Sequence, residues 1–193
     1  MVLAVLALGT LPSPTRVERA VAEAPDRLPA PPLPATTTTA PAPVVAGRHE
    51  VGTGGVPPGV YVTSGDLCTW ERLGAAGQVL ATDTGSGQQL VEVRTTDAGF
   101  SSSPGCGTWR TFVPGSPLPS FGPGTFAVGA QVAPGRWRSE TGDLCYWERL
   151  SGLGGGFDEL LASAGVPGPT EVVVAPTDAA FRSFGCGPWH PVP

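Results

Sequence analysis

The sequence predicts an all-β protein. We expect two tandem small antiparallel β-sandwich or barrel-like domains, each with one disulfide, after a disordered N-terminal linker rich in Pro and Thr. Three observations support this prediction. The chain contains 28 Gly and 23 Pro among 193 residues, and both residue types disfavour helices. A cysteine-containing motif occurs twice. Each copy also carries short β-branched runs bounded by turn residues, which is typical of strands.

The front of the chain differs in composition from the rest. Residues 1–12 are mostly apolar, too short to span a bilayer but within the range of a signal-peptide core. We interpret them as part of a signal or anchor segment, the only part of the chain expected to contact a membrane if it is retained. Residues 13–46 are rich in Pro, Ala and Thr and cannot bury a core. They are therefore predicted to form an extended linker.

The remaining residues repeat one unit. The segment from Gly65 to Leu73 (GDLCTWERL) recurs from Gly142 to Leu150 (GDLCYWERL), and the motif C-G-x-W follows in both copies. We place the two β repeats at residues 47–114 and 122–193, joined by a short Pro-containing link. Each unit is near 70 residues, a size at which a hydrophobic core alone is marginal.

The four cysteines are expected to form one disulfide in each repeat. Three pairings are possible, and the repetition selects the two within repeats: Cys68–Cys106 and Cys145–Cys186. Metal binding is disfavoured because no C-x-x-C occurs and the chain has only two His, so we expect neither a metal nor another cofactor. Disulfides indicate an oxidising compartment, which here means an extracellular or envelope-associated protein.

Each repeat contains segments with the pattern of strands. In the first repeat Val60–Thr63 and Leu90–Val93 are β-branched or apolar runs, and Gly85–Gly87 is expected to be a turn between strands. In the second repeat Arg136–Arg138 and Glu171–Val174 occupy the matching places.

Alternation with period two places a cysteine, a tryptophan and an arginine on one face of a strand in each repeat. Trp70 and Trp147 are therefore expected to pack against the disulfides. Arg72 and Arg149 are expected to reach a carboxylate or an aromatic ring. Asp66 and Asp143 are the candidate carboxylates, and the alternative for both is a role as turn residues only.

Composition argues against two function classes. The net charge is −5 and the 11 basic residues are scattered, so no patch could neutralise nucleic-acid phosphates. The adjacent Asp158 and Glu159 do not converge from separate places as a catalytic acid and base must, and no G-x-S-x-G motif is present. We therefore expect a protein that is not an enzyme.

Four aromatic residues are candidates for stacking against a ligand. They lie at matched positions near expected edges of the repeats: Tyr61, Trp137, Trp109 and Trp189. Such rings could form a platform for a sugar or a peptide, and the alternative is packing in the core.

The motifs P-G-x-[YW], C-x-W-E-R-L, T-D-x-x-F and C-G-x-W, taken together, resemble an uncharacterised β-rich repeat of exported actinobacterial proteins and lipoproteins. The resemblance covers residues 47–193. It implies export and a β fold, and it implies no catalytic residues. The expected function is that of a secreted or surface-tethered tandem β module that binds a cell-wall glycan or an envelope protein. The alternative is a structural or sensory ectodomain with no small-molecule ligand.

Overall fold

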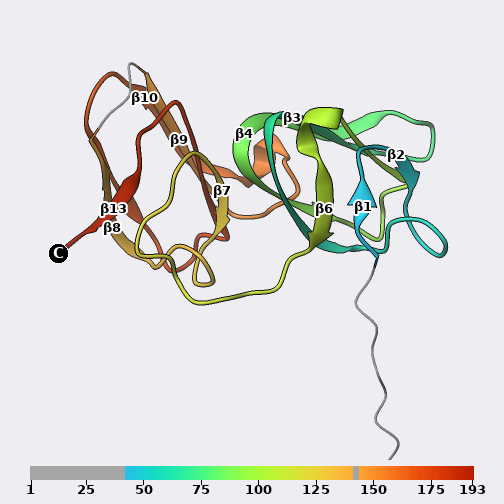
Figure 1. Cartoon of the computed structure of the whole chain (residues 1–193), viewed down its shortest axis with the longest axis horizontal. Helices are drawn as coiled ribbons and strands as arrows, with labels where there is room; N and C mark the ends of the chain where they lie inside the picture. The colour runs from blue at the N-terminus through green and yellow to red at the C-terminus, as the bar shows by residue number, and fades with distance from the viewer. Residues whose placement is uncertain (1–41, 141–143) are drawn as a thin grey trace, which may run out of the picture. The chain divides into compact units, whose positions relative to one another are not determined.

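The computed structural model describes residues 42–140 and 144–193. The expected signal segment and most of the expected linker lie outside the described residues. The strands of the first repeat and one short 3-10 helix, most of them labelled in Figure 1, are β1 (Val44–Val45), β2 (Gly47–Glu50), β3 (Gly59–Leu73), β4 (Val79–Val93), β5 (Gly99–Ser102), η1 (Pro104–Cys106) and β6 (Thr108–Thr111).

The first repeat is built on the antiparallel hairpin of β3 and β4, which are 15 residues long each. β3 also pairs with β5 and β6, and β2 pairs with β5. The register of the hairpin shifts between Gly65 and Cys68. The expected turn at Gly85–Gly87 is wrong, because these residues continue β4 and pair opposite that irregular stretch.

The second repeat divides the same strands between two sheets. Strands β7-β12-β9-β10 continue the sheet of the first repeat in a ten-stranded sheet, and a separate three-stranded sheet has the order β11-β8-β13. The elements are β7 (Gly124–Ala127), β8 (Gly135–Ser139), β9 (Cys145–Leu150), η2 (Phe157–Glu159), β10 (Leu160–Val166), β11 (Thr170–Val174), β12 (Ala180–Phe184) and β13 (Trp189–Val192). Here β8 and β9 together correspond to β3, and β10 and β11 to β4.

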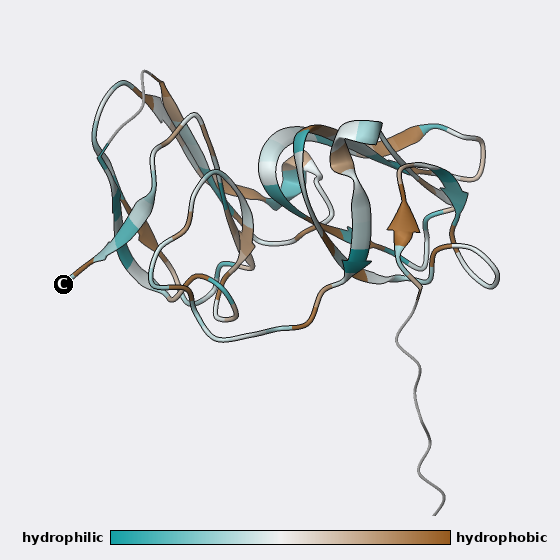
Figure 2. Cartoon of the chain, in the orientation of Figure 1, coloured by the Kyte–Doolittle hydropathy of each residue, from teal (hydrophilic) through white to brown (hydrophobic). Residues whose placement is uncertain are grey.

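Both repeats begin slightly earlier than their sequence boundaries suggest. Val44 on β1 pairs with Trp109 on β6, and Phe121 forms a bridge to Trp189 at the matching place in the second repeat. Both residues belong to hydrophobic cores. Figure 2 shows β1 as a strongly apolar strand. The short link between the repeats therefore ends before Phe121.

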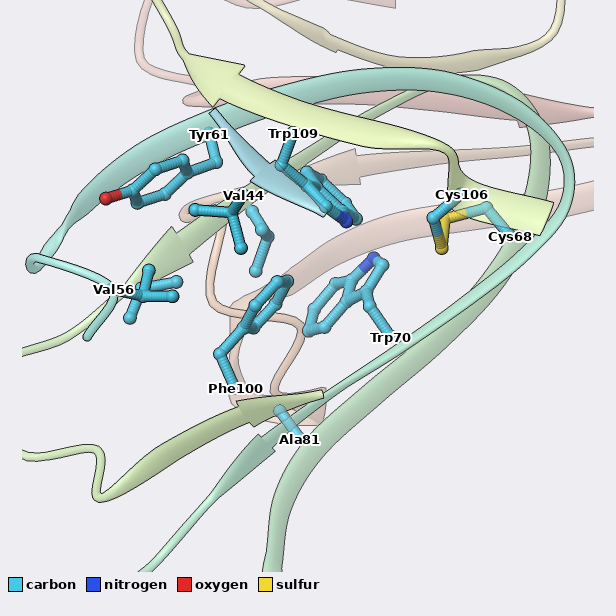
Figure 3. Close-up of a cluster of buried hydrophobic side chains, with 11 residues drawn as sticks. Val44, Val56, Tyr61, Cys68, Trp70, Ala81, Phe100, Cys106 and Trp109 are labelled. Atoms are coloured by element: carbon cyan, nitrogen blue, oxygen red, sulfur yellow. A yellow bond between two sulfur atoms is a disulfide. The ribbon is translucent and has the colours of Figure 1, made fainter. Parts of the chain in front are cut away.

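Each repeat has its own hydrophobic core. In the first, Figure 3 shows Trp70, Phe100 and Trp109 gathered near the disulfide. Phe100 and Trp109 meet edge to face at 5.4 Å between ring centroids. In the second, Phe181 and Trp189 meet in the same way at 5.0 Å. Such aromatic packing gives a small domain most of its buried apolar area.

The two repeats are joined by more than the chain between them. Both belong to one compact unit, and β4 of the first repeat forms a parallel bridge to β7 of the second, at Gln88 and Gly124. The Gln88 amide nitrogen also donates to the Thr125 carbonyl (2.9 Å) and to the Gln131 side chain (3.0 Å). The junction is thus a packed and hydrogen-bonded contact.

A candidate ligand site at the junction of the repeats

The four aromatic candidates for ligand stacking are buried. The exposed fractions of Tyr61 and Trp137 are 2%, and those of Trp109 and Trp189 are 0%. The stacking role that the sequence suggested for them is therefore wrong for this structure, because their rings fill the cores of the repeats. No face of these rings is available to a sugar or a peptide.

Hydrogen bonds explain why polar aromatic residues occupy these core positions. The Tyr61 hydroxyl donates to the Pro57 carbonyl at 2.6 Å, and the Trp137 indole N–H donates to the Ala133 carbonyl at 2.8 Å. Both bonds reach back four residues to the loop before the strand. Burial raises the pKa of Tyr61. Each ring thus fastens a loop to the core, a structural role that the repeat preserves with two different residues.

The expected disulfides are confirmed as Cys68–Cys106 and Cys145–Cys186. Trp70 lies in the same core as the first disulfide and is 2% exposed, as expected. Trp147 packs against the second core but is only partly buried. Trp70 is the more deeply buried of the two because a loop of the second repeat covers it.

Each strand arginine pairs with an aspartate that sequence reasoning did not select. Arg72 donates two hydrogen bonds of 2.7 Å to Asp97, and Arg149 donates bonds of 2.7 and 2.9 Å to Asp178. The expected partner Asp66 instead accepts a bond from the Ser86 hydroxyl, and Asp143 lies outside the described residues. The recurrence of T-D-x-x-F in both repeats was the signal that could have identified the two aspartates.

The paired aspartates are held in their charged form. Burial by itself raises the pKa of Asp97, but hydrogen bonds from Arg72 and the Arg94 amide, with the charges of both arginines, lower the pKa below its ordinary value of 3.8. Burial, Arg149 and the Ala175 amide act on the pKa of Asp178 in the same way, with the same net lowering. Both aspartates are buried, and Arg72 is buried with Asp97, whereas Arg149 is partly exposed. Both pairs are structural.

A glycine-rich loop of the second repeat covers the Trp70–Arg72 face of the first. The Gly154 carbonyl accepts a hydrogen bond from Arg72 (2.8 Å), and the Leu153 carbonyl accepts one from the Glu92 amide (2.8 Å). Gly155 lies flat against Trp70, where an added Cβ would come 2.5 Å from the ring. The loop can approach this closely only because it lacks side chains at these points.

Glu159 holds that loop in shape and anchors it. Its buried carboxylate accepts hydrogen bonds from the Gly154 and Gly155 amides (2.8 and 3.0 Å) and pairs with Arg94 of the first repeat. Its sequence neighbour Asp158 is exposed. The adjacent carboxylates therefore occupy different environments, and Glu159 serves the junction.

A pocket of about 230 Å³ has residues from both repeats in its wall. Two buried side chains that line it have an oxygen atom without a hydrogen-bond partner: Gln89 Oε1 and Ser183 Oγ, on residues 2% and 3% exposed. A buried polar atom without a partner costs about 1–3 kcal/mol. Five other buried polar atoms of the described residues also have no hydrogen-bond partner. Gln89 and Ser183 share the wall of this pocket, which makes it a candidate site for a polar ligand.

A second, larger hollow of about 370 Å³ adjoins this pocket. Both are lined by Tyr146 and Arg182, so the two form one cleft. The wall of the larger part includes the apolar side chains of Leu80, Leu160 and Phe157. Phe157 is 97% exposed.

Charged residues join the two parts of the cleft. Arg182 pairs with Asp83 of the first repeat and with Glu148, both at 2.5 Å. The Tyr146 hydroxyl donates to Glu148 at 2.6 Å. That hydrogen bond, followed by burial, raises the pKa of Tyr146. One guanidinium faces two carboxylates, so the floor of the cleft has a surplus of negative charge and of hydrogen-bond acceptors.

Comparison with known proteins gives the family. A model for the Rv1352-like extracellular domain matches the chain twice, at residues 39–110 and 119–190. The chain belongs to this family. Its two matches coincide with the two repeats, so the Rv1352-like domain is the repeated unit, and the protein is extracellular, as the disulfides indicated.

No curated protein and no solved structure matches the chain. Among the described residues, no helix has the length and apolar character needed to cross a membrane. Within the same ranges, no three His, Cys, Asp or Glu side chains gather as a metal site would require.

Proposed function

We propose that this tandem Rv1352-like module binds an envelope glycan, without catalysing a reaction, in the cleft at the junction of its repeats. The observation that carries the proposal is the pair of partnerless buried oxygens, Gln89 Oε1 and Ser183 Oγ, in the wall of one pocket. Both oxygens are closed off from solvent in this structure, so binding requires the side chains of the pocket wall to shift. The hydrogen bonds that a ligand then supplied would relieve their cost.

The chemistry of the cleft suits the hydroxyl groups of a sugar. A glutamine carbonyl accepts hydrogen bonds, a serine hydroxyl donates or accepts, and the Asp83 carboxylate accepts. Tyr146 and Phe184 line the same pocket and are 36% and 55% exposed. Exposed aromatic rings beside hydrogen-bonding groups can pack against the apolar face of a sugar ring. Together these groups favour a glycan over a purely apolar ligand.

The carboxylates of the cleft support a binding role over catalysis. A general acid or base needs a pKa suited to its task and a proton-transfer position near the substrate. Asp83 and Glu148 instead share one guanidinium, that of Arg182. Both carboxylates are thus engaged in ion pairs with one guanidinium, which is the arrangement of a binding surface.

Binding of purified cell-wall polysaccharide and of its soluble fragments to the full chain tests the proposal. Ser183→Ala removes one partnerless hydroxyl, so it should weaken binding about tenfold or more and leave the melting temperature unchanged or higher. The matched control is Ser102, at the equivalent position of the first repeat, where its hydroxyl accepts a bond from the Trp109 indole (3.1 Å). Ser102→Ala should lower stability and leave glycan binding unchanged.

A second candidate function is binding of an envelope protein. Phe157 favours it, because an aromatic side chain that is 97% exposed beside an apolar hollow is typical of protein contacts. Phe157→Ala would then abolish capture of an envelope protein and leave glycan binding unchanged. A structural or sensory ectodomain with no ligand, the remaining alternative, requires that neither variant changes any binding.

A further inference from the structure

The cleft at the junction of the repeats carries more negative than positive charge. Three carboxylates and one guanidinium lie in its walls: Asp83, Glu148, Glu159 and Arg182. The guanidinium pairs with two of these carboxylates at once, Asp83 and Glu148. The third carboxylate shares the guanidinium of Arg94 with Glu92. Two arginines therefore face four carboxylates, and the negative charges outnumber the positive ones by two.

This charge disfavours an anionic ligand and favours a cationic one. A sugar that carries a carboxylate, a phosphate or a sulfate group would be repelled by the unbalanced carboxylates, and a protonated amine would be attracted. A metal ion is another kind of cation. However, in the part of the chain that the structure describes, no three His, Cys, Asp or Glu side chains gather as a metal site would require.

The hydrogen-bonding capacity left over in the smaller pocket is that of acceptors. Asp83 Oδ2 accepts from Arg182 (2.5 Å), and Asp83 Oδ1 accepts from the Thr84 amide (2.8 Å). A carboxylate has about four lone-pair positions, so Asp83 can accept further hydrogen bonds. Gln89 Oε1, which can only accept, has no partner among the described residues.

Strand β4 brings these two acceptors together. Residues 83, 85, 87 and 89 share one face of the strand because side chains alternate, and positions 85 and 87 are glycines. The Gln89 side chain folds back over Gly85, where its Oε1 lies 3.3 Å from the place that a Cβ would occupy. Gly85 is the nearest neighbour of Asp83 on this face, and all three residues line the pocket. The terminal torsion of a glutamine is soft, so the amide can turn its oxygen toward a donor beside Asp83.

We infer that the glycan bound in this cleft carries a free primary amine, and that its ammonium group binds between Asp83 and Gln89 Oε1. An ammonium has three N–H donors and no acceptor, which matches a wall whose spare groups accept. N-acetylation removes the positive charge and adds a carbonyl, a further acceptor, at the same place. The inference rests on the proposed glycan binding and names the class of sugar.

The second repeat has no counterpart of this site. The equivalents of Asp83 and Gln89 are Ala164 and Thr170, which face equivalent residues of the neighbouring strand. Neither carries a charge. Each chain should therefore bind one amine group in this way, although the domain occurs twice.

Isothermal titration calorimetry of the full chain with two probes tests the inference: short glucosamine oligomers, and the same oligomers after N-acetylation. At a pH of about 5.5 the carboxylates are charged, since their ordinary pKa is about 4, and the sugar amine is protonated. We expect the glucosamine oligomers to bind one per chain and about tenfold or more tighter than the acetylated ones, because hydrogen bonds between charged groups are the stronger kind. Added salt should weaken this binding.

The variant Asp83→Asn keeps the size of the side chain and removes its charge. It should lower the affinity for glucosamine oligomers about tenfold and leave the affinity for the acetylated oligomers unchanged. The matched control is Glu140→Gln, which removes one charge from a side chain that is 60% exposed and lies in neither part of the cleft. This variant should bind both probes like wild type. Thermal melts of both variants identify any loss of affinity that comes from unfolding.

The possible failures separate the inference from the proposal on which it rests. Equal affinity of wild type for the two probes, or binding of neither probe while cell-wall polysaccharide binds, overturns the inference alone. A preference for the amine that persists in Asp83→Asn also overturns it, because the amine then binds elsewhere. So does displacement of the sugar by an equal concentration of trilysine, because charge alone is then recognised. If neither the probes nor the polysaccharide bind, the glycan-binding proposal fails as well.

Discussion

Gly155 is the residue on which the contact between the covering loop and Trp70 depends most directly. It combines a positive φ of +75° with an approach to Trp70 so close that an added Cβ would lie 2.5 Å from the ring. Trp70 is buried in the core of the first repeat, so it cannot turn away. The substitution Gly155→Ala therefore perturbs backbone conformation and packing together.

The two effects can be given separate magnitudes. A left-handed conformation costs an alanine about 1–2 kcal/mol. Inserting a methyl group into a filled space costs about 1–3 kcal/mol. We expect Gly155→Ala to lower the free energy of unfolding by about 2–5 kcal/mol. The loop should also release the bond from Arg72 to the Gly154 carbonyl, because Gly154 and Gly155 are adjacent.

Gly129 provides the matched control. It has a φ of +82° and nothing within 4 Å of an added Cβ, so Gly129→Ala should cost about 1–2 kcal/mol, the conformational part alone. Urea denaturation of both variants at neutral pH measures the difference. Equal losses of stability would refute the reasoning, because they would mean that the Trp70 contact contributes nothing to the junction.

Three further outcomes are expected. Because the pKa of Asp178 is lowered in the folded state, its contribution to stability is complete well above pH 3.8 and is lost as the pH falls from that value through the lower pKa of the folded state; urea midpoints of Asp178→Asn should therefore depend less on pH below about 5 than those of wild type. Trp70→Ala should cost about 3–5 kcal/mol and Trp147→Ala clearly less, since Trp147 is only partly buried; equal shifts in thermal melts would contradict this order. Replacing Cys145 and Cys186 by Ser should cost about 2–5 kcal/mol, and an unchanged melting temperature relative to the oxidised wild type would argue against a stabilising disulfide.

Much of the fold could be predicted because the two repeats are two sequences for one domain fold, so the features that both contain indicate its structure. The matched cysteines selected the two disulfides, and period-two alternation identified the strand that carries Cys68 and Trp70. Predictions from local composition were wrong where strand pairing determined the structure instead. Gly85–Gly87 has the composition of a turn, yet these residues extend β4 because β3 lies opposite.

The candidate site could not be predicted, because the two repeats differ where they meet. Arg182 and Tyr146 replace Ser101 and Thr69 of the first repeat, so a comparison that looks for common residues passes over them. The aromatic positions common to both repeats are core positions instead. Residues that are the same in both repeats therefore indicated how each unit folds. Residues that differ between the repeats line the cleft.

The disulfides also limit how far this protein can be stretched. Each bond joins cysteines 38 or 41 residues apart, so tension applied along the chain cannot extend the enclosed segment. At about 3.4 Å per residue, each disulfide prevents the extension of a segment whose fully extended length is on the order of 130 Å. If the strands outside the loops peel away under load, the core residues between the cysteines remain tied together. An extracellular domain held in this way begins refolding with the two ends of each closed loop already together when the load is released.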